Sequence, residues 1–221
     1  MQNKRLFIYC AGGQGRETLK VVRTINQREA RWDDVFFVDD YSRSSVMNDI
    51  PVITFSDYLR DFAMDEDRFI IANGEPVRRQ QIAEVLLQHS CQLETLVYPG
   101  IDKSPFHTIR EGVFIAEGVV LSDNISVGYC TCLNANATIG HNVELGDYVT
   151  ISPGAIVSGN VTIGDGTYIG TGAIIRDEVK IGKNCIIGMG SLVTKDIPDG
   201  VVAYGSPCRV VRENTDGIVF R

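Results

Sequence analysis

The stretch between residues 139 and 157 reads IGHNVELGDYVTISPGAIV, and an aliphatic residue occupies every sixth position of it. The same rhythm runs from Ile109 to Val193 through fifteen units without a break. Three positions after the aliphatic residue, Gly or Asn stands in eleven of the fifteen units, and these two residue types adopt positive φ most easily. The pattern therefore predicts a short strand with an inward aliphatic side chain, followed by a tight corner, every six residues.

A repeat of six residues is typical of hexapeptide β-helices, in which each unit forms one side of a coil and stacked coils bury the aliphatic column. The run resembles the left-handed parallel β-helix of hexapeptide acyltransferases. This resemblance implies a left-handed coil with three units per triangular turn. Fifteen units would make five coils, about 24 Å of stacked strands. We expect this all-β domain, with a C-terminal tail, to occupy residues 106–221.

The first part of the chain has a different pattern, in which short apolar strands alternate with helices. Strands are predicted over residues 6–9, 35–38, 69–72 and 93–97, and helices are predicted after the first strand and over residues 76–88. This alternation is typical of a parallel sheet with crossover helices. We therefore expect an α/β domain with a small Rossmann-like parallel sheet over residues 1–105.

Polar and glycine residues follow the predicted strands of this first domain. Ligands of parallel α/β sheets bind beyond the carboxyl ends of the strands, and a glycine-rich turn brings a phosphate to the backbone N–H groups at a helix N-terminus. Thr18 stands where a dinucleotide fingerprint has its third Gly or Ala, so we expect a nucleotide-sugar site rather than an NAD site. A tight turn without a ligand is the alternative. The candidate substrate-binding residues are Gly12, Gly13, Gln14, Gly15, Asp39, Asp40 and Asn73.

Composition and charge narrow the function classes. A formal net charge of −7 disfavours binding to a nucleic-acid backbone. No apolar stretch approaches the roughly 20 residues that span a bilayer, and the N-terminus lacks the core of a signal peptide. Cys130 and Cys132 lack the second pair that a zinc site would need. We expect a cytoplasmic protein with reduced thiols, no metal site and no membrane insertion.

The two halves together resemble one bacterial family. The motifs that carry the resemblance are GGQGRE at residues 12–17, FVDD at residues 37–40, the hexapeptide run, and AYGSPCR at residues 203–209. The family includes sialic acid O-acetyltransferases and acetyl-CoA-dependent N-acetyltransferases that act on bacillosamine and perosamine precursors. The resemblance implies a homotrimer with acetyl-CoA between neighbouring prisms. It also makes Arg79 a candidate phosphate ligand, although a solvated helix face is equally consistent with its position. The candidate cofactor-binding residues are Gly159, Gly170, Lys195, Gly205 and Pro207.

His141 is the one histidine within the repeat, and it stands at a corner, where its side chain should project outward. Transfer of an acetyl group to an amine or hydroxyl is assisted by a base that accepts a proton near neutral pH, which suits histidine. A solvated corner residue is the alternative interpretation. By resemblance, the backbone amide of Gly159, eighteen residues later, would stabilise the oxyanion.

The residue after His141 departs from the pattern of some relatives, which have a carboxylate there to orient the imidazole. In this chain that residue is Asn142, which the repeat also explains as a corner residue with positive φ. Glu144 and Asp147 are alternative orienting partners, and Glu144 is included among the candidate catalytic residues.

Three functions are compatible with these patterns. The leading hypothesis is an acetyl-CoA-dependent N-acetyltransferase that acts on the 4-amino group of a nucleotide-linked 4-amino-4,6-dideoxy sugar, in the biosynthesis of a bacterial surface glycan. The alternative is an O-acetyltransferase of sialic acid or a related sugar. A non-catalytic β-helical scaffold is a third hypothesis, and the separate glycine-rich domain, which a scaffold would not require, argues against it.

Overall fold

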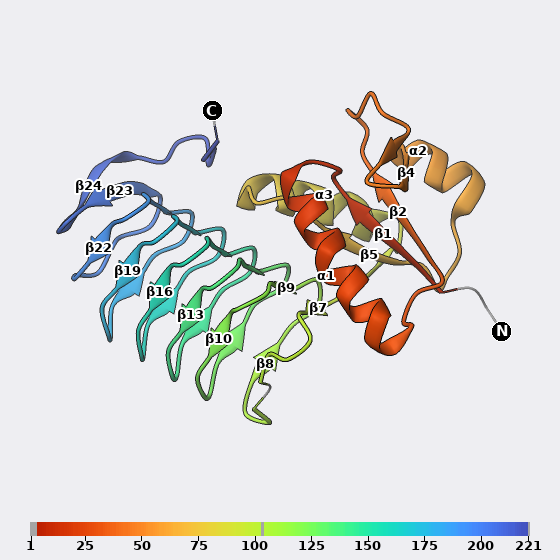
Figure 1. Ribbon diagram of the computed structural model, residues 1–221. Helices are drawn as coiled ribbons and strands as arrows, with labels where there is room; N and C mark the ends of the chain where they lie inside the picture. Colours follow the sequence, from red (N-terminus) through yellow and green to blue (C-terminus); the bar gives the residue numbers. More distant parts are fainter. Residues whose placement is uncertain (1–3, 103, 221) are drawn as a thin grey trace.

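The computed structural model describes residues 4–102 and 104–220. Figure 1 shows an α/β unit followed by a prism of stacked strands. The elements of the first unit are β1 (Arg5–Tyr9), α1 (Gly13–Glu29), β2 (Asp34–Val38), β3 (Val46–Met47), β4 (Ile50–Ile53), α2 (Phe55–Asp57), the π-helical turn η1 (Tyr58–Phe62), β5 (Arg68–Ile71), α3 (Pro76–Gln88) and β6 (Gln92–Leu93).

The sheet of the α/β unit has the strand order β3-β4-β2-β1-β5-β6. Its central strands β2, β1 and β5 are parallel, as predicted. The hairpin of β3 and β4 extends one edge and was not predicted, because its strands are too short to show an alternating pattern. The strand predicted over residues 93–97 is divided in two: β6 pairs with β5, whereas β7 (Leu96–Val97) pairs with β9 of the prism.

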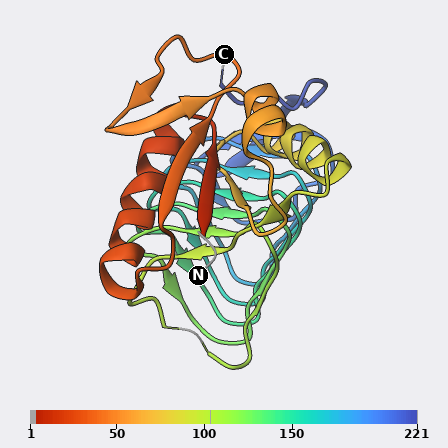
Figure 2. The same ribbon diagram turned by 90° about the vertical axis from the view of Figure 1, so that its right-hand side faces the viewer.

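The prism has three flat faces, and its triangular outline is visible in Figure 2. The β10 face contains β10 (Val120–Leu121), β13 (Thr138–Ile139), β16 (Ile156–Val157), β19 (Ile174–Ile175) and β22 (Leu192–Val193). The β8 face contains β8 (Thr108–Ile109), β11 (Ser126–Val127), β14 (Glu144–Leu145), β17 (Thr162–Ile163) and β20 (Lys180–Ile181). The β9 face contains β7, β9 (Phe114–Ile115), β12 (Cys132–Leu133), β15 (Thr150–Ile151), β18 (Tyr168–Ile169), β21 (Ile186–Ile187), β23 (Val201–Gly205) and β24 (Cys208–Glu213).

Each strand from β8 to β19 pairs in parallel with the strand eighteen residues later, which confirms the predicted three units per coil. The aliphatic column is buried; Ile139, Val157 and Ile175 have no exposed surface. Each such side chain contributes about 1.5–3 kcal/mol when it is fully buried. Positive φ recurs at every corner from Gly112 to Gly190. The strand-and-corner repeat of this left-handed β-helix therefore follows from the sequence rhythm.

The α/β unit packs against the β9 face. Phe114, Ala116 and Cys132 share a buried cluster with residues of β1 and α1, and Arg79 of α3 binds the corner that joins the β8 and β9 faces. Lys20 forms an ion pair with Glu117 at the corner that joins the β9 and β10 faces. All of these contacts therefore lie on the β9 face or its two edges. The corner that joins the β8 and β10 faces lies on the opposite side of the prism.

The C-terminal segment folds back from the far end of the prism toward the α/β unit (Figure 1). Its Phe220 ring meets Tyr168 edge to face, and the buried Glu75 carboxylate at the start of α3 accepts the N–H groups of Val219 and Phe220. Within the described residues, no helix is long and apolar enough to cross a membrane.

Candidate functional site

His141 lies at the corner that joins the β10 and β8 faces, because it follows β13 of the first and precedes β14 of the second. This corner stacks one residue per coil at eighteen-residue spacing, and the exposed His141 is the second residue of the stack. The stack consists of Asp123, His141, Gly159, Asp177 and Lys195. The α/β unit of the same chain packs on the β9 face, so it does not cover the corner that carries His141.

The absence of a side chain at Gly159 makes room for the imidazole. A Cβ atom at residue 159 would lie 2.6 Å from both Nε2 and Cε1 of His141, which is closer than Cβ contacts occur. The ring therefore rests on the backbone of the next coil, as the eighteen-residue spacing predicts. On its other side, Asn142 Nδ2 lies 3.2 Å from His141 Nδ1 and also donates to Asn160 Oδ1 at 3.0 Å.

The predicted oxyanion donor has an acceptor within the protein. The Gly159 N–H donates to Asp177 Oδ1 at 3.0 Å. The same contact recurs at another corner, where the Asp147 N–H donates to Asp165 Oδ1 at 3.0 Å, far from any histidine of the repeat. A carboxylate that accepts the backbone N–H of the preceding coil is thus a recurring structural contact of this prism. At residue 159 it occupies the amide that was expected, by resemblance, to stabilise the oxyanion.

The two carboxylates considered as orienting partners do not reach the imidazole. Glu144 is exposed on the β8 face and makes no described contact with His141. Asp147 lies at the neighbouring corner, where it accepts the Tyr129 N–H and pairs with Arg110. The side chain that does contact the imidazole is Asn142, which the sequence explained only as a corner residue.

A second candidate site lies in the α/β unit, at the carboxyl ends of β1, β2 and β5. A cavity of about 950 Å³ opens there, large enough for a nucleotide-linked sugar. Of the predicted substrate residues, Gly12, Asp39, Asp40 and Asn73 line it. Its apolar wall comes from Phe55, Leu59, Ile82 and Val85.

The two aspartates hold the loops of this cavity in place. Asp39 accepts the N–H groups of Ala11, Tyr41 and Ser42, which ties the glycine-rich turn to the loop after β2. Asp40 accepts the Phe55 N–H and the Tyr9 hydroxyl. Burial, reinforced by Asp40, raises the pKa of Tyr9, so this hydroxyl stays protonated and donates.

Four of the predicted substrate residues do not line the cavity: Gly13, Gln14, Gly15 and Arg79. Gly13 begins α1 beside it. Gln14 points to the prism, where its amide lies 3.9 Å from the Cys132 sulfur. A Cβ at Gly15 would lie 2.1 Å from the Cys10 carbonyl oxygen, so this glycine permits the close approach of α1 to β1.

Arg79 is buried, and its guanidinium joins the α/β unit to the prism. It donates to the carbonyl oxygens of Asn73, Cys130, Tyr148 and Val149 and to the Thr150 hydroxyl. Burial lowers the pKa of Arg79 from its ordinary value. A contact between Arg79 and a substrate phosphate would require the side chain to leave these acceptors. The neighbouring Arg78 is exposed and lines the cavity.

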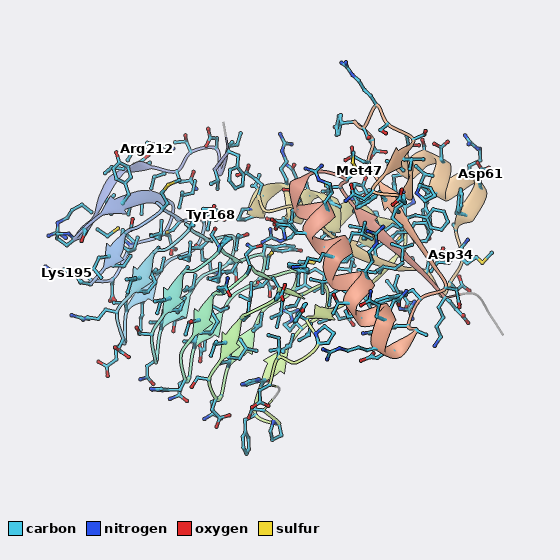
Figure 3. All side chains as sticks on the ribbon, viewed as in Figure 1. Asp34, Met47, Asp61, Tyr168, Lys195 and Arg212 are labelled. Carbon is cyan, nitrogen blue, oxygen red and sulfur yellow. The ribbon has the colours of Figure 1, made fainter. Side chains whose placement is uncertain are left out.

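The predicted cofactor residues fall into two groups, one on each edge of the β10 face. Gly159 and Lys195 belong to the His141 corner, and Figure 3 shows Lys195 at the end of the prism remote from the α/β unit. Gly170 is buried at the opposite edge, where a Cβ would lie 2.6 Å from the Met189 nitrogen. Gly205 and Pro207 form the exposed turn between β23 and β24. One prism therefore presents these residues to two different sides.

All six cysteines are free thiols, and burial raises the pKa of Cys130 to about 12 and that of Cys132 to about 11. Among residues 4–102 and 104–220, no three His, Cys, Asp or Glu side chains are grouped so as to hold a metal ion. Arg78, Tyr9 and Phe55 are the site residues that sequence reasoning missed. Only the position of Arg78 in the first turn of a predicted helix could have indicated it.

Each half of the chain matches a known protein family. The PglD N-terminal domain family matches residues 5–86, and the bacterial transferase hexapeptide family matches residues 160–195. GDP-perosamine N-acetyltransferase of Escherichia coli O157:H7 is 32% identical over 135 residues, which span 61% of this chain and 61% of that relative.

Two solved structures are similar over nearly the whole chain. The acetyltransferase domain of PglB from Neisseria gonorrhoeae FA1090, in complex with acetyl coenzyme A, has a TM-score of 0.88 at 28% identity, covering 95% of this chain and 100% of that one. PerB from Caulobacter crescentus, in complex with CoA and GDP-perosamine, has a TM-score of 0.84 at 25% identity, covering 93% and 96%. The chain belongs to the hexapeptide-repeat sugar acetyltransferases with a PglD-type N-terminal domain.

Proposed function

We propose that this protein transfers the acetyl group of acetyl-CoA to the amino group of a nucleotide-linked sugar. The sugar we propose is a 4-amino-4,6-dideoxy sugar destined for a bacterial surface glycan. Residues 1–105 would bind the nucleotide and residues 106–221 would supply the acetyl-transfer site. The observation that carries the proposal is the His141 imidazole resting on Gly159 at an open corner of a left-handed β-helix. The related PerB structure holds CoA and GDP-perosamine, which supports the same substrate classes here.

The reaction needs few catalytic groups once the amine and the thioester are correctly positioned. The free amine attacks the thioester carbonyl carbon, the C–N bond forms, and the carbonyl electron pair moves to oxygen. The C–S bond then breaks, and the proton released by nitrogen balances the CoA thiolate that leaves. A positioned hydrogen-bond donor at the oxygen lowers the barrier most, because charge develops there. His141 is the side chain that we place next to the reacting atoms.

The nucleotide cavity and His141 of one chain lie on opposite sides of the prism, so we propose that the site is completed by a second copy. Four of the five outward side chains on the β10 face beside His141 are exposed and aliphatic, and Thr138 is the fifth. The four are Val120, Ile156, Ile174 and Leu192, with exposed fractions of 56%, 40%, 42% and 36%. Contiguous exposed apolar surface marks an interface. A homotrimer packed through this face would bring a neighbouring chain to the His141 corner and acetyl-CoA between the prisms.

The test is thiol release from acetyl-CoA with a panel of nucleotide-linked sugars. The panel contains 4-amino sugars on uridine, thymidine and guanosine diphosphates, together with hydroxyl-only analogues and sialic acid. We expect release with a 4-amino sugar, and mass spectrometry should show one added acetyl group on nitrogen. Release only with hydroxyl acceptors would replace the proposal with O-acetylation. No release with any acceptor, together with no binding of acetyl-CoA, would favour the scaffold.

His141→Ala should lower turnover by about 100-fold or more, because removal of one transition-state donor or proton acceptor costs 10²–10³. The side chain is exposed, so the fold and the oligomer should be unchanged. Asp123→Ala, one coil before His141 on the same corner, is the matched control and should retain activity. Turnover of His141→Ala within about threefold of wild type would show that His141 has no catalytic role.

A further inference from the structure

The C-terminal strap, residues 214–220, starts at the far end of the prism. The Asn214 N–H donates to the Gly200 carbonyl oxygen at 2.7 Å, and the Asn214 side-chain amide donates to the Asn184 carbonyl oxygen at 2.8 Å. The Asn214 carbonyl of the same amide accepts the N–H of Gly217, which has a φ of 66°. The strap therefore leaves the prism through a tight turn, at the corner that joins the β8 and β9 faces.

The other end of the strap is bound by Glu75, the N-cap residue of α3. This side chain is buried, and in the described chain its carboxylate does not cap its own helix. One carboxylate oxygen accepts the Val219 N–H and the other accepts the Phe220 N–H at 3.4 Å. A buried carboxylate requires hydrogen-bond donors. Both donors that the described residues supply to Glu75 come from the strap.

The residues that the strap holds follow directly after a residue of the nucleotide cavity. Asn73 lines that cavity, and its side-chain oxygen accepts the Glu75 N–H at 2.9 Å. Its side-chain nitrogen lies 3.6 Å from the sulfur of Cys10, another cavity residue. The Phe220 ring lies over Gly74, where a Cβ atom would be 3.7 Å from Cε2 of the ring. The orientation of the Asn73 amide thus depends on a turn that the strap covers.

The strap also packs against the first turn of α3. A Cβ atom at Gly217 would lie 3.2 Å from Cγ2 of Val77. The Phe220 ring meets the Tyr168 ring of the prism edge to face, with 5.7 Å between the centroids. Arg78, the cavity residue of α3, belongs to the same turn as Val77. The strap therefore braces the segment that carries two polar residues of the cavity.

We propose that the C-terminal strap and Glu75 position Asn73 and the first turn of α3 for binding of the nucleotide-linked sugar. This inference rests on the proposed function of the cavity. A preordered site binds more tightly, because the ligand does not lose affinity to the ordering of loops and side chains. The strap leaves the prism from a different corner than His141, so we expect it to affect nucleotide-sugar affinity and not the chemical step.

A chain that ends at Asn214 removes the strap but keeps its attachment to the prism. Calorimetry with uridine, thymidine and guanosine diphosphates should show about tenfold weaker binding of the nucleotide that the full chain prefers, as expected when a site loses its preordering. The KM for the nucleotide sugar should rise by the same factor, whereas kcat and the affinity for acetyl-CoA stay within about threefold. Unchanged nucleotide affinity in a folded shorter chain would overturn the proposal.

Hydrogen exchange of the Glu75 N–H measures the positioning without any ligand. This N–H donates to the Asn73 side chain, so it reports the turn that the strap covers. In the shorter chain we expect its exchange to be about tenfold faster or more, since loss of the strap favours local opening. Exchange in β1 is the internal control and should not change. Equal exchange of the Glu75 N–H in both chains would show that the strap does not hold the turn.

Glu75→Gln tests the attachment in a chain of full length, including the case in which the shorter chain does not fold. The amide keeps one acceptor but turns a donor toward the second strap N–H. We expect the KM for the nucleotide sugar to rise about threefold or more, as for one lost hydrogen bond. Glu84→Gln, on the exposed side of the same helix, is the matched control and should leave KM unchanged. An unchanged KM in Glu75→Gln would exclude Glu75 as a positioning residue.

The combined variant shows whether Glu75 acts through the strap. In the chain that ends at Asn214, Glu75→Gln should change KM by less than about twofold, because residues that act through one contact are not additive. Effects that multiply would mean that Glu75 acts independently of the strap.

Failure of this inference is distinguishable from failure of the proposed function. If thiol release occurs but removal of the strap alters neither exchange nor nucleotide affinity, the function stands and the inference falls. If the full chain binds no nucleotide and supports no thiol release, the proposed function falls, and the role of the strap in nucleotide binding falls with it.

Discussion

Two adjacent arginines of α3, Arg78 and Arg79, lie in different environments. Arg78 is exposed at the cavity of the α/β unit, whereas Arg79 is buried with five hydrogen bonds, four of them to the prism. Arg79→Met should lower the free energy of unfolding by about 3 kcal/mol or more, because each buried acceptor left unpaired costs about 1–3 kcal/mol. Denaturant unfolding monitored by circular dichroism measures this change.

Arg78→Met is the matched variant at the neighbouring position. It should change the free energy of unfolding by less than about 0.5 kcal/mol, as exposed substitutions do. Its KM for the nucleotide sugar should rise about tenfold, because a charge-assisted bond to a phosphate contributes about 1.5–3 kcal/mol. If KM were unchanged in Arg78→Met but raised in a folded Arg79→Lys variant, Arg79 and not Arg78 would be the residue that contacts the phosphate.

At the scale of the element, the polarity of the outward side chains differs between the faces of the prism. On the β10 face four of the five outward side chains are aliphatic, with Thr138 the exception, whereas the β8 face carries Ser126, Glu144, Thr162 and Lys180. Ile174→Asp should prevent trimer formation, because it would bury an unpaired carboxylate in the proposed interface. Light scattering measures the mass, and thiol release should disappear with the trimer.

Thr162→Asp is the control, since it makes the same change at the equivalent position of the β8 face. It should leave both mass and activity unchanged. A trimeric Ile174→Asp variant would exclude the β10 face as the interface. A fully active monomer, from either variant, would exclude a cofactor site shared between subunits.

At the scale of the whole molecule, the α/β unit lies on the face opposite His141. We therefore expect that chains with complementary defects restore each other. His141→Ala and Arg78→Glu chains, each inactive alone, should recover activity when they are coexpressed and purified as mixed oligomers. Random mixing in a cyclic trimer leaves about a quarter of the sites with both halves intact. Thiol release measures the recovery; no recovery in proven mixed trimers would mean that cavity and His141 act within one chain.

Much of the prism could be predicted, because every six-residue unit has the same three features. These are an extended strand, a corner residue with positive φ, and one buried aliphatic side chain. The buried Ile139 and Ile151 and the corner φ of Asn142 follow from the six-residue rhythm. The first unit was predicted less completely. Its central strands and α3 are long enough to show a pattern, whereas β3 and β4 are two and four residues long.

The position of His141 over Gly159 was also predictable, since eighteen residues make one coil and only a glycine leaves room for the ring. The capture of the Gly159 amide by Asp177 was not, because a hydrogen bond depends on the rotamer of an exposed side chain. The sequence offered Glu144 and Asp147 as partners of His141, whereas the structure places Asn142 against the imidazole, because such a contact depends on side-chain orientation at the corner.

The sequence alone determined the coil, its inward column and the corner on which His141 stands, because these are local and periodic properties. Only the tertiary structure decided which face of the prism the α/β unit covers and which arginine is left free for a ligand. Those outcomes depend on contacts between residues far apart in the chain, such as Arg79 with Tyr148. Burial, and not residue type, distinguishes Arg78 from Arg79, and burial is a property of the folded molecule.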